Sequence, residues 1–187
     1  MVWLKRRRLQ EPFELAYWVV PGKLAAGCYP GDRNPGEAER KLRSILEAGI
    51  RYFINLMEPH ERDRSGNVFV PYDNVLAQLA AAMRVDIEYV RRPLKDMAAP
   101  SREDVHALLN EIEHALARNM PVYVHCLGGK GRTGTLVGCY LARHDIARRA
   151  DVLQKIKTLR KRLPDRGWPS PETEEQQLLV LSWNAGE

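Results

Sequence analysis

The most informative segment of the chain, residues 122–134, reads Val122-Tyr123-Val124-His125-Cys126-Leu127-Gly128-Gly129-Lys130-Gly131-Arg132-Thr133-Gly134. Apolar, β-prone residues lead into a glycine-rich turn, after which a helix can begin. In such a turn, successive backbone N–H groups can point to one centre, where the helix dipole adds positive potential. Glycine permits the left-handed backbone that brings a chain close to an anion. The segment therefore predicts a phosphate-binding loop between a strand and a helix.

Two other interpretations of this loop fit less well. Gly129-x-Gly131-x-x-Gly134 matches a dinucleotide-binding pattern, whose ribose-binding acid is expected about 20 residues later. Asp151 has that spacing but lies in a basic segment that we expect to be helical. A phosphate loop of the nucleotide triphosphatases needs Ser or Thr after its lysine, whereas Gly131 follows Lys130.

A third interpretation uses Cys126, which opens the turn, and Arg132, six positions later. A thiol among inward-pointing amides, at a helix N-terminus and near a guanidinium, is expected to ionise readily, and the thiolate is a strong nucleophile. The planar guanidinium of Arg132 matches two oxygens of a phosphoryl group, which a lysine does not. An isolated cysteine would instead indicate an inert buried residue. The combination predicts covalent phosphate chemistry.

His125-Cys126-x5-Arg132-Thr133 resembles the HCx5R(S/T) signature of the cysteine-dependent protein-tyrosine and dual-specificity phosphatases. The order of the expected elements is compatible with that family over residues 18–184. The resemblance implies that Cys126 attacks phosphorus, that Arg132 stabilises the transition state, that His125 orients the loop and that Thr133 stabilises the thiolate. It also implies that no metal or other cofactor is needed. The phosphoryl oxygens would be held by the backbone amides of Leu127, Gly128, Gly129, Lys130, Gly131 and Arg132.

The family's general acid is an aspartate on a loop some 30 residues or more before the cysteine. Asp96 lies 30 residues before Cys126, in a predicted loop that follows a strand. Asp86 and Asp104 are its rivals, but Asp86 begins a strand and Asp104 lies in the first turn of a helix, where a carboxylate has a capping role. Asp96 could also be a solvated residue paired with a neighbouring lysine or arginine. Gln176 matches a glutamine that positions the hydrolytic water in some of these phosphatases, although helix packing also explains it.

The pattern of the whole chain predicts strands alternating with helices, and therefore an α/β fold with a mainly parallel central sheet flanked by helices. We expect one domain over residues 1–187, with residues 1–16 as a basic N-terminal arm. Asn34 and Ser101 are expected to cap helices, and Gly49 to end one. The expected strands are 18–20, 23–26, 51–56, 85–90 and 122–125. The expected helices are 34–49, 72–83, one that starts at 101 and has an apolar stripe to Leu116, 132–144, 148–163 and 171–183.

Composition sets limits on the function. The net charge is +5, with 44% hydrophobic and 28% charged residues, as in an ordinary globular domain. No apolar run reaches the roughly 18 residues that would span a bilayer. Cys28, Cys126 and Cys139 are odd in number and lack CxxC spacing, which argues against a disulfide framework and a zinc site. We expect a cytoplasmic monomer that binds no nucleic acid.

The sequence leaves the substrate open. The favoured function is hydrolysis of phosphotyrosine in proteins, and also of phosphoserine or phosphothreonine, through a phosphocysteine intermediate. Lys130 resembles one of two lysines in the loop of the tensin-type lipid phosphatases, so an inositol phosphate or phosphoinositide is the alternative substrate. A catalytically weak module that binds phosphorylated partners is the alternative of another class. The basic residues of segment 148–163 could also give a weak contact with an anionic membrane.

Overall fold

The computed structural model describes residues 11–63 and 65–187. Within them, one sheet has the strand order β1-β2-β5-β3-β4. Strand β1 is antiparallel to β2, and the other neighbouring pairs are parallel. The predicted α/β fold with a mainly parallel central sheet is confirmed. The strands are β1 (Ala16–Val20), β2 (Leu24–Gly27), β3 (Tyr52–Asn55), β4 (Glu88–Arg91) and β5 (Val122–His125).

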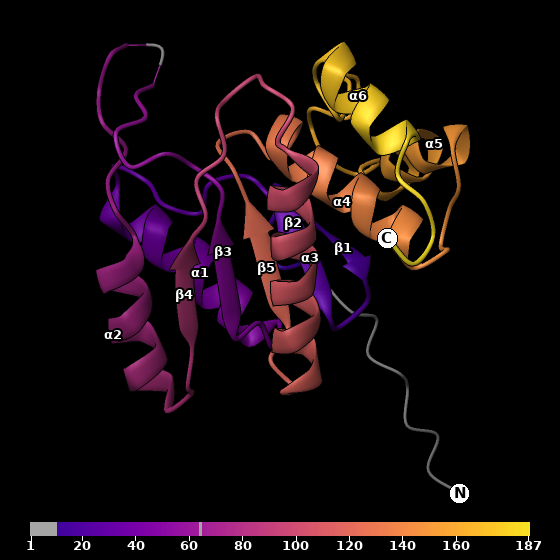
Figure 1. Ribbon diagram of the computed structural model, residues 1–187. Helices are drawn as coiled ribbons and strands as arrows, with labels where there is room; N and C mark the ends of the chain where they lie inside the picture. Colours follow the sequence, from indigo (N-terminus) through magenta and orange to yellow (C-terminus); the bar gives the residue numbers. More distant parts are fainter. Residues whose placement is uncertain (1–10, 64) are drawn as a thin grey trace, which may run out of the picture.

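Helices cover both faces of the sheet (Figure 1). Helices α1 (Pro35–Glu47) and α2 (Asp73–Met83) pack against each other on one face. On the other face, α3 (Arg102–Ala117) and α4 (Gly131–Arg143) contact β5, while α5 (Ala150–Leu159) and α6 (Glu174–Leu181) pack beside α4. Tyr52 and Ile54 of β3 join one apolar core and Phe53 joins the other. The central strands are therefore buried on both faces, as parallel strands usually are.

The predicted helix caps are confirmed. The side chain of Asn34 accepts a hydrogen bond from the backbone N–H of Gly36, and that of Ser101 accepts one from Asp104. Helix α1 ends just before Gly49, which adopts a φ of 93°. These short-range signals fix the helix starts because the cap and its partner lie within three residues of each other.

Three element boundaries differ from the prediction by three residues or more. Strand β4 begins at Glu88 rather than residue 85, because its partner β3 begins at Tyr52, directly opposite Glu88. Helix α5 ends at Leu159 rather than residue 163. Helix α6 begins at Glu174 rather than Pro171, because Thr173 forms a capping box with Gln176.

Most of the predicted basic arm, residues 1–10, lies outside the described residues. The residues that follow contact the domain: Phe13 is buried, and the Ser44 hydroxyl of α1 donates to the carbonyl of Pro12. Within residues 11–63 and 65–187, no helix combines the length and apolar character that a bilayer span would require.

Candidate active site

The candidate site lies at the carboxyl edge of the parallel strands. Cys126 directly follows β5, which lies between β2 and β3, and α4 begins at Gly131. The loops that follow β3 and β4 begin at the same edge of the sheet, because these strands are parallel to β5. Residues 126–130 therefore form a turn that several loops surround, and the Cys126 side chain is buried within it.

Position 129 requires a glycine, both because of its backbone conformation and because of the atoms around it. Its φ is +66°, which other residues adopt only at a cost. A Cβ atom at this position would lie 2.5 Å from the backbone carbon of Gly27 at the end of β2. The carbonyl of Leu127 also accepts a hydrogen bond from the N–H of Tyr29, at 3.0 Å. The turn is thus held close against the end of β2.

Arg132 lies in the first turn of α4, and its side chain is only 1% exposed. Its Nη1 donates to the carbonyl of Leu94 at 3.1 Å and to a carboxylate oxygen of Glu61. Its Nη2 donates to the other oxygen of Glu61 at 3.0 Å and lies 3.1 Å from Oδ1 of Asp96. Its Nε has no hydrogen-bond partner among the described residues. The Nε–H group of Arg132 is therefore available to donate a hydrogen bond to an anion.

Glu61 is the site residue that sequence reasoning did not find. It lies on the loop after β3, 71 residues before Arg132. No local pattern indicates this contact, because it depends on β3 lying next to β5 in the sheet, which the sequence alone does not reveal. Burial alone would lower the pKa of Arg132, but hydrogen bonding to Glu61 and the charge of Cys126 outweigh burial and raise it. Arg132 therefore stays a cation.

Asp96 lies on the loop between β4 and α3, and half of its side chain is exposed. It pairs with Arg132 rather than with Arg92, which binds Glu111 instead. The next residue, Met97, has a φ of 59°, a left-handed conformation that is uncommon outside glycine. The structure thus brings Asp96 beside Arg132, while Asp104 caps α3 with Ser101. A general-acid role for Asp96 stays a prediction.

His125 lies behind the turn, fully buried between aromatic rings. Its Nδ1 is 3.2 Å from the carbonyl oxygen of Cys126, and its Nε2 is 2.6 Å from the hydroxyl of Tyr72. A carbonyl can only accept, so Nδ1 carries the proton and Nε2 accepts from Tyr72. Burial lowers the pKa of His125 to about 3. The imidazole is therefore neutral, and it fixes the carbonyl of Cys126 away from the centre of the loop.

Two further predicted residues have contacts of a different kind. The hydroxyl of Thr133 is buried and has no hydrogen-bond partner among the described residues, so its role toward the thiolate stays a prediction. Gln176 uses its whole amide: Oε1 accepts from the backbone N–H groups of Glu172 and Thr173, and Nε2 donates to the carbonyl of Ala98 at 3.1 Å. Gln176 thus ties the start of α6 to the loop that carries Asp96, and its water-positioning role stays a prediction.

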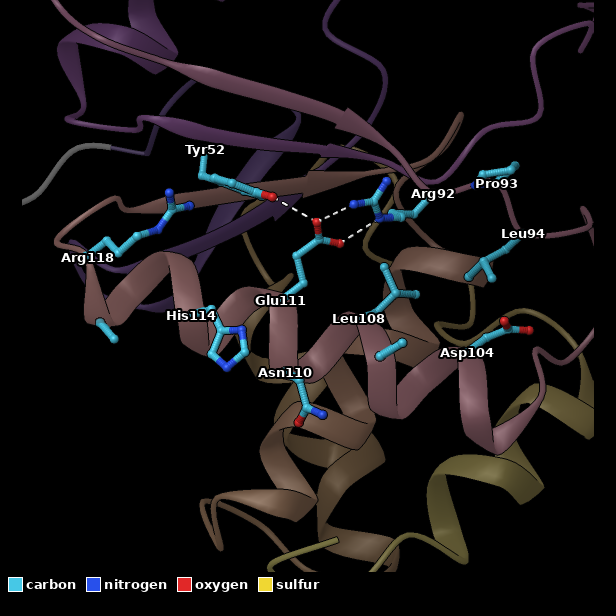
Figure 2. Close-up of a pocket in the computed structure, with 12 residues that line it drawn as sticks. Tyr52, Arg92, Pro93, Leu94, Asp104, Leu108, Asn110, Glu111, His114 and Arg118 are labelled. Atoms are coloured by element: carbon cyan, nitrogen blue, oxygen red, sulfur yellow. Dashed lines mark hydrogen bonds and ion pairs between the residues drawn. The ribbon is translucent and has the colours of Figure 1, made fainter.

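A cavity of 980 Å³ lies apart from the Cys126 turn, between α3 and strands β3 and β4. Figure 2 shows Glu111 in its wall, where it binds Arg92 in a forked pair and accepts from the hydroxyl of Tyr52. Pro93 and Leu94, which also line it, begin the loop that leads to Asp96. No cysteine, serine or threonine is among the residues that line the cavity, so we do not assign the nucleophile to it.

Comparison with known proteins identifies the family. Residues 30–146 match the family model described as "Polymorphic toxin system, DSP-PTPase phosphatase". The chain belongs to this DSP-PTPase family. The resemblance seen in the sequence, to the cysteine-dependent protein-tyrosine and dual-specificity phosphatases, is thereby confirmed.

The relatives of this chain include proteins named as lipid phosphatases and proteins named as protein phosphatases. The chain is 28% identical, over 162 residues, to the phosphatidylglycerophosphate phosphatase PTPMT2 of Arabidopsis thaliana, covering 86% of this chain and 61% of that protein. It is 27% identical to the dual specificity protein phosphatase CDC14A of Mus musculus, covering 76% of this chain and 22% of that protein. The chain thus spans less than two thirds of these relatives.

Solved structures agree with the fold. The active form of Tk-PTP superposes with a TM-score of 0.66 at 23% identity, covering 90% of this chain and 95% of that one. PTPMT1 in complex with PI(5)P gives a TM-score of 0.64 at 16% identity, covering 90% and 94%. At these identities the likeness concerns the fold alone.

Replacing Glu61 tests the forked pair with Arg132. In Glu61→Ala the buried guanidinium loses its main counter-charge, and we expect a loss of about 3 kcal/mol in the free energy of unfolding. Urea unfolding of the variant and the parent chain measures this. Glu58→Ala, an exposed carboxylate on the same loop, is the matched control and should cost far less. Equal losses in the two variants would contradict a special role for Glu61.

The buried neutral His125 predicts a particular pH dependence of stability. In the unfolded chain this imidazole binds a proton below about pH 6.5, whereas in the folded chain its pKa is about 3. Unfolding therefore takes up one extra proton between these values, and stability falls as the pH drops, by about 1.4 kcal/mol per unit. Measuring the free energy of unfolding of the parent chain and of His125→Asn between pH 7 and 4 isolates the contribution of His125. The free energy of the variant should fall less steeply as the pH drops, and equally steep falls would refute the contribution of His125.

Proposed function

We propose that this chain is a phosphatase that hydrolyses phosphotyrosine in proteins, and also phosphoserine or phosphothreonine, through a phosphocysteine intermediate. One observation carries the proposal: Cys126 is buried at the start of the turn, and Arg132, which interacts electrostatically with it, is buried with an Nε that has no partner among the described residues. A phosphoryl group in the turn would receive backbone N–H groups and this remaining guanidinium donor. Family membership supports the same chemistry.

Among the three thiols, only Cys126 is suited to act as the nucleophile. Burial raises the pKa of Cys28 to about 12 and that of Cys139 to about 12, which keeps both protonated. Cys126 instead faces a turn whose amides and Arg132 stabilise an anion. Its thiolate attacks phosphorus, a P–S bond forms, and the P–O bond to the leaving group breaks.

Asp96 supplies the proton that the leaving oxygen needs. Its carboxylate lies 3.1 Å from Nη2 of Arg132, the atom beside the unpaired Nε, so an arriving phosphoryl group that takes this edge displaces the carboxylate toward the leaving group. Released from Arg132, Asp96 takes up a proton from solvent and then donates it to the leaving oxygen. In the second step it accepts a proton from water, which attacks phosphorus, breaks the P–S bond and regenerates the thiolate.

Exposed apolar side chains support an aryl phosphate as the substrate. Met97, directly after Asp96, is 57% exposed. Trp168, whose ring lies beneath the ammonium group of Lys130, is 64% exposed. A tyrosine ring would be flanked by apolar surface while its phosphate lies in the turn. A binding module would not need Asp96 beside Arg132, and we therefore favour an enzyme.

The second candidate substrate is an inositol phosphate or a phosphoinositide. Lys130 lies in the turn and would add positive charge, as a highly charged headgroup requires. Its Nζ lies 3.6 Å from a carboxylate oxygen of Glu172, which offsets part of that charge. The similarity to a phosphatidylglycerophosphate phosphatase also favours a lipid-borne phosphate. Assays that compare phosphopeptides with inositol phosphates and phosphoinositide vesicles distinguish the two candidates.

Replacing the nucleophile tests the proposed chemistry. Cys126→Ser should hydrolyse no phosphotyrosine peptide, because a neutral hydroxyl in the turn does not attack phosphorus, yet it should still bind the peptide. Phosphate release measures turnover, and calorimetry measures binding. Cys28→Ser, which alters a thiol outside the turn, is the control and should keep its activity. Appreciable turnover by Cys126→Ser would remove this residue as the nucleophile.

Replacing the general acid separates substrates by their leaving groups. Asp96→Asn should slow hydrolysis of a phosphotyrosine peptide by about 10²–10⁴-fold, and that of an activated aryl phosphate far less, because its leaving group needs little protonation. Turnover numbers for both substrates measure the difference. Asp104→Asn is the control, since that carboxylate accepts a hydrogen bond from the Ser101 hydroxyl at the start of α3. If both substrates slow equally, Asp96 is not the acid.

A further inference from the structure

A hairpin beside the candidate site exposes two valines. Arg62 and Val68 pair as an antiparallel bridge in the segment that leads from β3 to α2. We call residues 61–63 and 65–70 the β3–α2 hairpin. Figure 1 shows the segment extending beyond the carboxyl ends of the strands, on the same side as the loop between β4 and α3. Val68 is 47% exposed and Val70 is 48% exposed.

Both ends of the β3–α2 hairpin are attached to the candidate site. At one end, Glu61 forms the forked pair with Arg132. At the other end, the hydroxyl of Tyr29 donates to the carbonyl of Val70, and the ring centres of Tyr29 and Phe69 are 5.4 Å apart. The backbone N–H of the same tyrosine donates to the turn after β5. The hairpin is therefore held next to the nucleophile's loop.

The middle of the hairpin is fixed by Asp63. Its Oδ1 accepts from the backbone N–H groups of Ser65 and Asn67, at 2.8 and 2.9 Å. Its Oδ2 pairs with Arg33, on the segment before α1. A turn in which one carboxylate satisfies several backbone donors keeps its shape. The two valines are thus exposed on a segment whose position is fixed before any ligand arrives.

Exposed apolar side chains gather around the turn that carries Cys126. Six large apolar residues are exposed in the described part of the chain, and four of them lie on loops beside this turn: Val68, Val70, Met97 and Trp168. Single exposed apolar residues need no explanation, whereas a group of them around one site indicates a binding surface. The hairpin adds its two valines to the apolar residues that already flank the turn.

The charges of the hairpin favour a peptide as the occupant. Residues 58–70 contain three acids, Glu58, Glu61 and Asp63, against two arginines. A surface that docks on an anionic bilayer instead surrounds its apolar residues with lysine and arginine. Val68 also lines a hollow of 50 Å³ together with Glu61. A side chain that covers the valines therefore lies next to the carboxylate that holds Arg132.

We propose that Val68 and Val70 form an apolar subsite for a peptide substrate, which accepts an apolar side chain near the phosphorylated residue. This inference rests on the proposed function as a protein phosphatase. With the phosphoryl group in the turn, the peptide backbone lies over the surrounding loops, and alternate side chains of an extended peptide point the same way. One of them can cover the valines, and the removal of this apolar surface from water strengthens binding.

Peptide assays test the proposal. One phosphotyrosine peptide is prepared with leucine or with serine at each neighbouring position in turn. At the matching position the leucine version should have a kcat/KM about tenfold above the serine version, as burial of one apolar side chain contributes. The gain should lie in KM and persist as salt rises, because it involves no ion pair. In Val68→Thr/Val70→Thr, which keeps the size of both side chains, the two peptides should have nearly equal kcat/KM.

The matched control is Ile146→Thr, which alters an exposed apolar residue between α4 and α5. It should keep the leucine preference. The proposal is overturned if no position prefers leucine, if the double valine variant keeps the preference, or if the control loses it equally. Hydrolysis of the serine version in the same assay reports on the protein-phosphatase function separately, so that function can stand while the subsite fails.

Inositol phosphates and vesicles that contain phosphoinositide form the remaining arms. If these are hydrolysed and no peptide is, the proposed protein substrate fails together with the subsite. A double valine variant that loses activity on vesicles but not on soluble inositol phosphate would assign the valines to a bilayer and overturn the peptide subsite.

Binding to Cys126→Ser checks the same contact without turnover. The leucine peptide should bind about tenfold more tightly than the serine peptide, and adding the two valine substitutions should remove the difference. Equal Kd values for the two peptides before the valines are replaced would contradict the subsite.

Discussion

The buried guanidinium of Arg132 is the point on which the site depends. A cation that is 1% exposed must be compensated, or the cost of removing it from water would oppose folding. Glu61 provides the charge, and the carbonyl of Leu94 accepts from Nη1. The loops after β3 and β4 are therefore held against the turn by one group, which also places Asp96 beside it. The ion pair that compensates the buried charge thus also brings the loops of the candidate site together.

The other side of the turn is held by neutral groups. His125 donates to the carbonyl of Cys126 and accepts from Tyr72, and the lowered pKa keeps this imidazole uncharged. A protonated histidine here would need a counter-ion, which would compete with phosphate for the positive potential of the turn. A neutral His125 therefore supports the loop without reducing the positive potential inside it.

The parts of the structure that local patterns specify could be predicted from the sequence. Residues 122–134 are contiguous, so their strand, turn and helix follow from neighbouring residues, as do the caps at Asn34 and Ser101. Glu61 and Tyr72 could not be found in this way, because they meet their partners across 71 and 53 residues. Such contacts depend on which strands are neighbours, and periodicity does not reveal strand order. The start of β4 was misplaced for the same reason.

The segment between α5 and α6, together with the start of α6, contacts two loops of the candidate site. Ser170 and Trp168 contact Lys130 of the turn, while Gln176 holds the carbonyl of Ala98 on the acid loop. Gly134 allows this close approach, since a Cβ there would lie 2.2 Å from the hydroxyl of Ser170. One segment thus supports both the nucleophile's loop and the acid's loop.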